Sequence, residues 1–503
     1  MDELSAARIR VFLNDPSATG DTAPIPSEPP RDTERGPWGF RVDGEGISPP
    51  AGEYDPDTPE FVHWQLAAAL ERGRKLWAAR FPASGTWIPG VVLPAVPVAG
   101  EDLNAYYDRR ALRFFRGRNP ETDSLVHSAE SPDIAAHEQG HAVLDAVRPD
   151  LWDAPHFEVA AFHEAFGDLA SIGIAFAEPA LIRAVLEETG GALAESNLVS
   201  RVAEELGAAA RARFGPGVAL PGALRDAVNV FTYSDPAFLP SSAPADQLSA
   251  EPHSFCRLFT GACWDILVAL YLGSGGGRGN AAHDGAALSA AAREVGRLLS
   301  VATERAPIGA PFFSLVAGAM LGASAGDRDE REAIRSVFER RGLSPVEVAI
   351  PPPEPQPATV RGAAAAIPDE VLAQLEMLLG PVREEEILTR PPARSRMLRG
   401  RRKRDLVLSG REYGPADGAA VELSDAFEVP LRRDIYFAAA IAYPAGEEEE
   451  EDARAWVRFL AATGRIASES EDPEFLSLAR SGRSHRVVRE EDGVRRLRRA
   501  WVT

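Results

Sequence analysis

HEQGH at residues 137–141 and HEAFGD at residues 163–168 are the two stretches of this sequence that decide the fold. If the first stretch is helical, His137 and His141 are one turn apart and project from the same face. Two neutral imidazoles at this spacing can bind one zinc ion, while the neighbouring carboxylate of Glu138 reaches a water molecule on the metal. The alternative is a surface helix that carries two histidines by chance, and it would leave the second stretch unexplained.

The second stretch places two carboxylates on a helix that we expect between residues 157 and 176. Glu164 and Asp168 are four residues apart, and the other side chains of this helix are mostly apolar, so we expect it in a core. Buried carboxylates are costly unless they meet a cation or hydrogen-bond donors. A zinc ion would be the cation for Glu164, and Asp168 could accept the free ring N–H of a ligand histidine. A buried ion pair with arginine is the weaker alternative, because this helix contains no arginine.

Together, HEQGHAV and HEAFGD resemble the thermolysin-like (gluzincin) family of zinc metallopeptidases, whose pattern is H-E-x-x-H followed by a helix bearing N-E-x-x-x-D. The resemblance implies Zn2+ as the cofactor. It also implies that His137, His141 and Glu164 are the metal ligands. Glu138 would be the general base, and Asp168 would orient a ligand histidine. His163 stands where the family usually has asparagine.

The similarity runs from about Thr58 to Gly342 and implies the family's α+β fold of two lobes. We expect a β-containing amino-terminal lobe that ends in the zinc helix, a helical catalytic lobe, and a small α+β module at the carboxyl end. The predicted boundaries are an extended or disordered arm at 1–57, the two lobes at 58–145 and 146–349, a proline-rich linker at 350–368, and an accessory module of unknown role at 369–503.

The family's chemistry also needs a donor for the oxyanion that develops during peptide hydrolysis. His253, in the segment HSFCRLF, is similar to the histidine of the family's V-H-x-x-S segment, which stabilises the transition state. Asp246 or Glu251 could orient this imidazole, and the sequence does not choose between them. A capping or surface role for a single histidine is the alternative. The family's transition-state tyrosine has no counterpart, since Trp152 stands near its place.

Three further segments resemble the family's substrate-binding residues. Asn104 and Ala105 are similar to the start of its N-A-F-W edge strand, which can pair with an extended peptide, although a plain turn is an equal alternative. Arg225, in GALR, looks like the arginine that binds the carbonyl after the scissile bond. Ile134 and Leu224 would then line an apolar S1′ pocket, which implies cleavage before bulky hydrophobic residues.

The composition limits the partners and the compartment of the chain. A net charge of −21 argues against nucleic acid or an anionic membrane as the main partner, and we expect no stretch long enough to span a membrane. Residues 1–4, MDEL, lack the layout of a secretory signal. Cys256 and Cys263 would lie about 10 Å apart in a helix, too far for a mutual disulfide. Free thiols and no signal favour a cytoplasmic location, with unconventional export left open.

Two weaker signals concern other ligands. The basic run at 394–404 could suggest nucleic acid, but without interleaved aromatic residues a solvated or internally paired arm is favoured. Calcium is not implied, because Ala175 stands where the family has a second acidic ligand beside the position of Asp133.

We therefore predict a zinc endopeptidase in which Glu138 takes a proton from water and passes it to the leaving amine. Its partner is a peptide or protein substrate, and the sequence does not predict an oligomeric state. The main alternative is a catalytically weak or inactive zincin-fold protein that serves as a scaffold for a partner. An aminopeptidase is a further alternative, which would need an acidic anchor for the substrate amine near Asn104.

Overall fold

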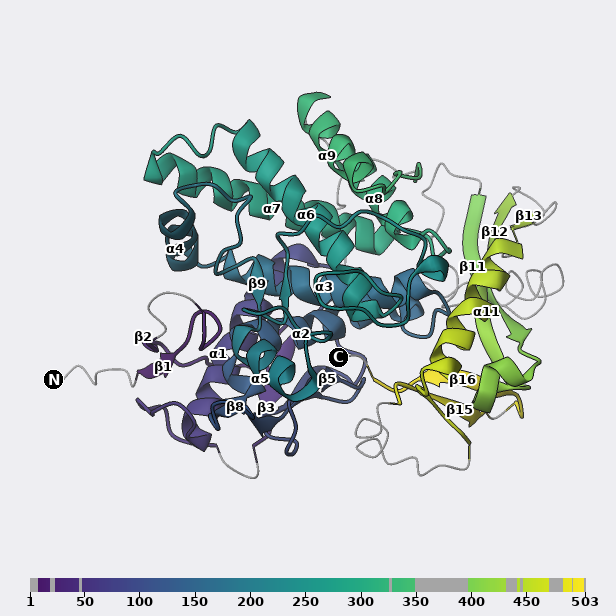
Figure 1. Ribbon diagram of the computed structural model, residues 1–503, viewed down its shortest axis with the longest axis horizontal. Coiled ribbons are helices and arrows are strands. Elements are labelled where there is room, and N and C mark those ends of the chain that lie inside the picture. Colours follow the sequence, from purple (N-terminus) through teal and green to yellow (C-terminus); the bar gives the residue numbers. More distant parts are fainter. Residues whose placement is uncertain are drawn as a thin grey trace.

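The computed structural model contains both helices and sheets, and the predicted α+β class is confirmed at that level (Figure 1). The structure describes the following residues: 8–18, 23–44, 48–324, 328–348, 397–430, 441–443, 447–469, 483–490 and 492–501. The predicted proline-rich linker at 350–368 lies outside the described residues.

A four-stranded sheet supplies the strands nearest the candidate site. Its order is β3 (Gly39–Val42), β4 (Val92–Val96), β6 (Leu112–Phe114) and β5 (Ala105–Tyr107). β3, β4 and β6 run parallel, and β5 pairs antiparallel with β6, so β5 is an edge strand. The prolines between Trp87 and Val98 favour an edge or irregular strand, but β4 is interior. Leu93 and Ala95 are fully buried there. The stabilisation from burying them outweighs the loss of one ladder hydrogen bond at Pro94, which has no backbone N–H.

Part of the segment that we expected as an extended arm is ordered β-structure. β3 belongs to the sheet, and Phe40 within it and Trp38 directly before it are buried. β1 (Ile9–Val11) pairs with β2 (Ile25–Ser27) and packs on α1 (Pro59–Arg80). The apolar side chains of this segment thus reach the core, which a count of its prolines and charges did not predict. Two more strands, β7 (Arg116–Arg118) and β8 (Leu125–His127), form a hairpin before residue 132.

Three helices form the framework of the candidate site: α2 (Pro132–Val147), α3 (Phe157–Ala175) and α6 (Pro252–Gly273). α3 packs against α2 and α6. α2 begins with Ser131 as its N-cap, whose Oγ accepts a hydrogen bond from the backbone N–H of Ile134. α6 begins in the same way with Glu251, and both helices have proline directly after the cap. This combination satisfies free backbone donors and starts the helix with a preset φ.

α2 and α3 approach closely because glycine stands at their contact. A Cβ atom on Gly140 would lie 2.8 Å from the Cβ atom of Ala170. A Cβ atom on Gly167 would lie 2.6 Å from Cε1 of His137, which is too close for any side chain. The absence of a side chain at Gly167 therefore leaves the space in which the His137 imidazole lies against α3.

The remaining elements before residue 349 surround this framework: α4 (Pro179–Thr189), β9 (Arg201–Val202), α5 (Glu204–Phe214), β10 (Arg225–Asp226), α7 (Ala281–Arg305), α8 (Phe312–Ala323) and α9 (Arg328–Arg340). Within the described ranges, α6 is long and apolar enough to cross a membrane by length and composition, as is the pair α3 and α4 if a bend of 96° is allowed. We expected no such stretch, so that expectation is corrected. The most apolar window of α6 is 72% buried, because α6 packs against α3, α7 and α9. Cys256 and Cys263 on α6 are buried and free, as predicted.

The carboxyl-terminal module, residues 397–501, is drawn in green to yellow at one end of the molecule (Figure 1). Its sheet has the order β11-β12-β16-β15-β14, with β13 beside β12. Its elements are β11 (Met397–Val407), β12 (Ala420–Pro430), β13 (Ile441–Tyr443), α11 (Glu447–Ala462), β14 (Ile466–Ala467), β15 (His485–Arg489) and β16 (Arg495–Arg499). In the basic run, Lys403 pairs with Glu422 and Arg404 pairs with Glu450. These two basic side chains are therefore paired inside the module.

Candidate metal centre

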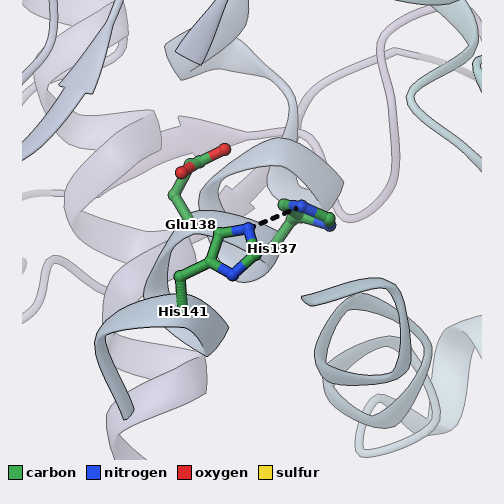
Figure 2. A group of neighbouring side chains, drawn as sticks. All are labelled: His137, Glu138 and His141. Atoms are coloured by element: carbon green, nitrogen blue, oxygen red, sulfur yellow. Dashed lines mark hydrogen bonds between the residues drawn. The ribbon is translucent and has the colours of Figure 1, made fainter. Parts of the chain in front are cut away.

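His137 and His141 project from consecutive turns of α2, and Figure 2 shows their imidazoles side by side. Their Nε2 atoms are 3.0 Å apart. Glu164 from α3 brings Oε2 to 3.5 Å from Nε2 of His137 and 3.9 Å from Nε2 of His141. Ligand atoms around a tetrahedral zinc ion, with bonds of about 2.0–2.1 Å, lie about 3.3 Å from one another. The three atoms therefore fit three corners of one coordination sphere.

The hydrogen-bond pattern of these residues also fits a metal. Oε2 of Glu164 is buried and makes no hydrogen bond of good geometry within the part of the chain that the structure describes, although ring nitrogens of three histidines approach it within 3.2–3.9 Å. Such an oxygen is costly unless a cation or donor meets it. Burial lowers the pKa of His141 well below its usual value, so its ring is neutral and its lone pair is available for a metal. Two histidines and a glutamate are a ligand set that zinc accepts.

Glu138 offers a second carboxylate at the same place. With His137 and His141 it forms a group whose candidate ligand atoms lie within 4.8 Å of one another (Figure 2). Burial raises the pKa of Glu138 to about 8, and the charge of His137 only partly opposes this rise. A carboxyl group with a pKa near neutrality can both accept and return a proton. This His-Glu-x-x-His cluster supports a metal site of the zincin type.

Asp168 lies one turn beyond Glu164 on α3 and contacts His137. Its Oδ1 atom is 3.1 Å from Nδ1 of His137, and this contact directs the opposite nitrogen, Nε2, to the metal position. Arg225 from β10 donates to the same carboxylate from Nε and Nη2 at 2.9–3.0 Å. Burial raises the pKa of Asp168, but Arg225 and His137 outweigh it and lower the pKa to about 2. The ion pair with arginine that we considered the weaker alternative is thus present beside the histidine contact, because the arginine comes from β10.

His253 lies on another side of Glu164, in the first turn of α6. Its Nε2 atom is 3.2 Å from Oε2 of Glu164, and its Nδ1 atom is 2.7 Å from Oε1 of Glu251. Of the two acids that the sequence left open, Glu251 makes this contact. Burial lowers the pKa of His253, but Glu164 and Glu251 outweigh it and raise the pKa to about 8. The ring can therefore present an N–H donor at the site.

A cavity of about 460 Å³ opens beside these residues. His137, Glu138 and His253 line it. So do all of the residues that we expected to contact substrate, namely Asn104, Ala105, Ile134, Leu224 and Arg225. Apolar side chains from α2 and from the segment before β10 thus face the same space as the candidate catalytic groups.

The carboxyl-terminal module contributes contacts in this region that the sequence did not predict. Arg465 lines the cavity. The indole Nε1 of Trp152 donates to the backbone carbonyl of Arg499 at 3.3 Å, and the ring of Trp501 lies 5.9 Å from that of Tyr106 in β5. No local motif marks these residues, because they reach the site only through the packing of the module.

Two of the departures from the family pattern, His163 and Trp152, lie together. The ring of His163, which is buried, is 6.0 Å from that of His141 and 6.2 Å from that of Trp152. The Arg109 guanidinium lies 4.6 Å from the centre of the Trp152 ring. The indole is therefore packed between a histidine and an arginine, and its N–H is used by the module.

A second group of buried acids lies near the amino-terminal end of α2. Oxygen atoms of Asp15, Asp133 and Glu204 lie within 4.8 Å of one another. Burial raises the pKa of all three, and neighbouring carboxylates raise those of Asp133 and Glu204 further. Arg72 and Arg201 supply partly compensating positive charge to Asp133 and Glu204 respectively.

Because these acids are buried together, we expect the free energy of unfolding to decrease as the pH rises. We expect a smaller decrease in Glu204→Gln. An acid whose pKa is raised by folding stabilises the folded state below its unfolded pKa, which is 4.5 for glutamate, and the contribution is lost as the pH rises through the folded pKa. For Glu204→Gln we expect the free energy of unfolding to increase on the order of 2 kcal/mol at about pH 9 and to change little at about pH 5. Urea denaturation measures this, with the exposed Glu187→Gln as control. The same pH dependence in wild type and variant would contradict the prediction.

Comparisons with known proteins add little to this geometry. No protein-family model matches the chain, and no curated protein matches it. Among solved structures, the precursor of protealysin, a metalloproteinase from Serratia proteamaculans, is similar at 13% sequence identity and a TM-score of 0.37. The match covers 68% of this chain and 88% of that one. Because this similarity is low, the functional assignment depends on the site itself.

Proposed function

We propose that this chain is a zinc-dependent endopeptidase of the thermolysin-like, two-lobed kind, and that it cleaves before bulky hydrophobic residues. The observation that carries the proposal is the convergence of His137, His141 and Glu164 on one point, where their nearest atoms are 3.0–3.9 Å apart. Glu138 and His253 face the adjoining cavity and supply a base and a donor beside that point.

When bound to the two histidines and Glu164, zinc would polarise the scissile carbonyl and make a water molecule more acidic. Glu138 accepts a proton from the attacking water, whose oxygen forms a bond to the carbonyl carbon. Glu138 then delivers that proton to the amide nitrogen as the C–N bond breaks. Burial raises the pKa of Glu138, so its carboxyl group can hold the accepted proton until the amide nitrogen takes it.

Other side chains act on the substrate. His253 donates a hydrogen bond to the carbonyl oxygen as negative charge develops there. Arg225 donates hydrogen bonds to Asp168 from Nε and Nη2. Its Nη1 atom makes no hydrogen bond within the described ranges and can donate to a substrate carbonyl. Ile134 and Leu224 supply apolar surface for the side chain that follows the cleaved bond.

Cleavage of a peptide library with and without a chelator tests the proposal. We expect the zinc-loaded protein to cut before leucine, isoleucine, valine and phenylalanine, to stop when the metal is removed, and to resume when zinc is added back. Cleavage that persists in the chelator would contradict the proposal. Release of single amino-terminal residues would instead indicate an aminopeptidase.

Bound zinc without any cleavage would favour the second candidate, an inactive zincin-fold scaffold. The observation in favour of that candidate is Trp152, which has no phenol and whose N–H is already bonded to Arg499. The metal content of the purified protein, measured beside the cleavage assay, separates the two functions.

A further inference from the structure

The carboxyl-terminal module inserts one charged side chain into the candidate site. Arg465 follows α11 and lies at the cavity that His137 and His253 also line. Its Nη2 atom donates to Oε1 of Glu251 at 3.1 Å. The same oxygen is the one that contacts Nδ1 of His253 at 2.7 Å. A chain of polar contacts thus joins the module to the proposed oxyanion donor.

We infer that Arg465 is a positioning residue of the candidate active site, and that the docked module is needed for full activity. Arg465 acts through Glu251 on His253 and does not itself touch the reacting atoms. The inference rests on the proposed peptidase function, and it gives the module a role that its sequence did not indicate.

The contacts of Glu251 explain how Arg465 would act. Its Oε1 atom accepts from His253 and Arg465, and its Oε2 atom accepts from the backbone N–H of Ser254 at 3.0 Å. Three donors from two parts of the chain therefore restrict rotation of this carboxylate. If Arg465 is removed, Oε1 keeps only the imidazole, and the imidazole has a less rigid partner. A donor that is misplaced by a fraction of an ångström stabilises a developing charge less well.

The module holds Arg465 firmly. The backbone N–H of Arg465 donates to the carbonyl of Leu460 at 2.8 Å, and its carbonyl accepts from the N–H of His485 at 3.0 Å. Its guanidinium also lies 6.0 Å from the centre of the Phe459 ring. The side chain therefore starts from a backbone position that α11 and β15 both fix.

The module is in turn attached to the amino-terminal end of α3. Asp452 lies 2.6 Å from Nδ1 of His156, and the ring of Trp456 lies 5.8 Å from that of Phe157. His156 is the N-cap residue of α3, the helix that carries Glu164. The module that carries Arg465 therefore packs on α3, the same helix that carries the proposed metal ligand Glu164.

The main effect of Arg465 is to orient His253 through Glu251, and its contribution to the stability of the fold is secondary. The side chains of Arg465 and Glu251 are 28% and 21% exposed, and Glu251 keeps its contacts with His253 and the Ser254 N–H when Arg465 is absent. A variant that lacks the guanidinium should therefore fold, and a loss of activity in it can be attributed to the site.

Three substitutions in the full chain, loaded with zinc, test the inference. Arg465→Gln should lower kcat roughly tenfold to a hundredfold, as for other residues that orient a catalytic group, and should change KM much less. Arg465→Lys should recover part of the loss, because an ammonium can still donate to Glu251. Arg458→Gln is the matched control, since Arg458 pairs with Glu451 on α11, away from the cavity. Thermal unfolding should be similar for all three variants.

A second measurement does not depend on cleavage. In the zinc-free chain, the ring ¹⁵N signals of His253, assigned by their loss in His253→Gln, should shift in Arg465→Gln and stay unchanged in Arg458→Gln. If no variant cleaves any peptide but the signals shift, the proposed function fails while the positioning contact stands. Equal kcat in wild type and Arg465→Gln with unshifted signals would overturn the inference. A higher kcat in Arg465→Gln would overturn it as well, because the module would then inhibit the site.

Discussion

Replacing Glu138 with glutamine should lower the rate of peptide cleavage by about 10² to 10⁴-fold while zinc remains bound. Glutamine has nearly the shape of glutamate but cannot accept a proton, so the attacking water keeps its proton and the leaving nitrogen receives none. The proposed ligands His137, His141 and Glu164 are untouched. Cleavage of casein, measured together with zinc content by atomic absorption, checks both halves of the expectation.

The same experiment decides between two roles for Glu138. Its carboxylate lies close enough to both histidines to be a ligand itself. Loss of zinc from Glu138→Gln, with zinc retained in Glu164→Gln, would therefore exchange the roles of the two glutamates. Full activity in Glu138→Gln would remove Glu138 from the mechanism. Glu294→Gln, which changes a glutamate paired with Arg297 on α7, is the control and should keep full activity.

Arg225→Met should destabilise the folded protein by about 3–5 kcal/mol. Arg225 makes three hydrogen-bond contacts with the buried carboxylate of Asp168, and both side chains are almost inaccessible to solvent. Without the guanidinium, Asp168 keeps its contact with His137 but loses the largest opposing charge around it. Urea denaturation of the zinc-free chain near neutral pH measures the cost without the contribution of the metal.

The double variant Arg225→Met with Asp168→Asn is the informative partner of this experiment. It removes the carboxylate charge together with the guanidinium, so it should be more stable than Arg225→Met alone. Asparagine accepts the Nδ1–H of His137 less strongly than a carboxylate does, however, so we expect zinc affinity to fall roughly tenfold to a hundredfold in the double variant. A cost below about 1 kcal/mol for Arg225→Met would mean that Asp168 takes up a proton or finds another donor.

Helix geometry explains why much of the candidate site could be predicted from sequence. His137 and His141 are separated by one turn of one helix, as are Glu164 and Asp168. Spacing within a helix is local, so the face that each pair shares follows from residue numbers alone. The N-cap serine and proline before α2 are equally local signals. The α+β class, in contrast, is what the resemblance to the thermolysin-like family implies.

Errors arose where one element meets another. The prolines of β4 favour an edge or irregular strand, but β4 is a regular interior strand because its apolar side chains are buried in the sheet. Glu251 could not be chosen over Asp246, because the choice depends on where α6 begins and how the chain enters it. Arg225 was expected to serve the substrate only, since nothing in its own segment indicates the carboxylate of Asp168.

By itself, the sequence determined which side chains could form a metal site and on which helix faces they lie, because a helix repeats every 3.6 residues whatever surrounds it. Only the tertiary structure decided that Glu164 meets both histidines, that Arg225 pairs with Asp168, and that Arg465 reaches Glu251. Those contacts join residues far apart in the chain, and they depend on how closely helices and modules pack. Gly167 illustrates the link, because its missing side chain has meaning only once α2 lies against α3.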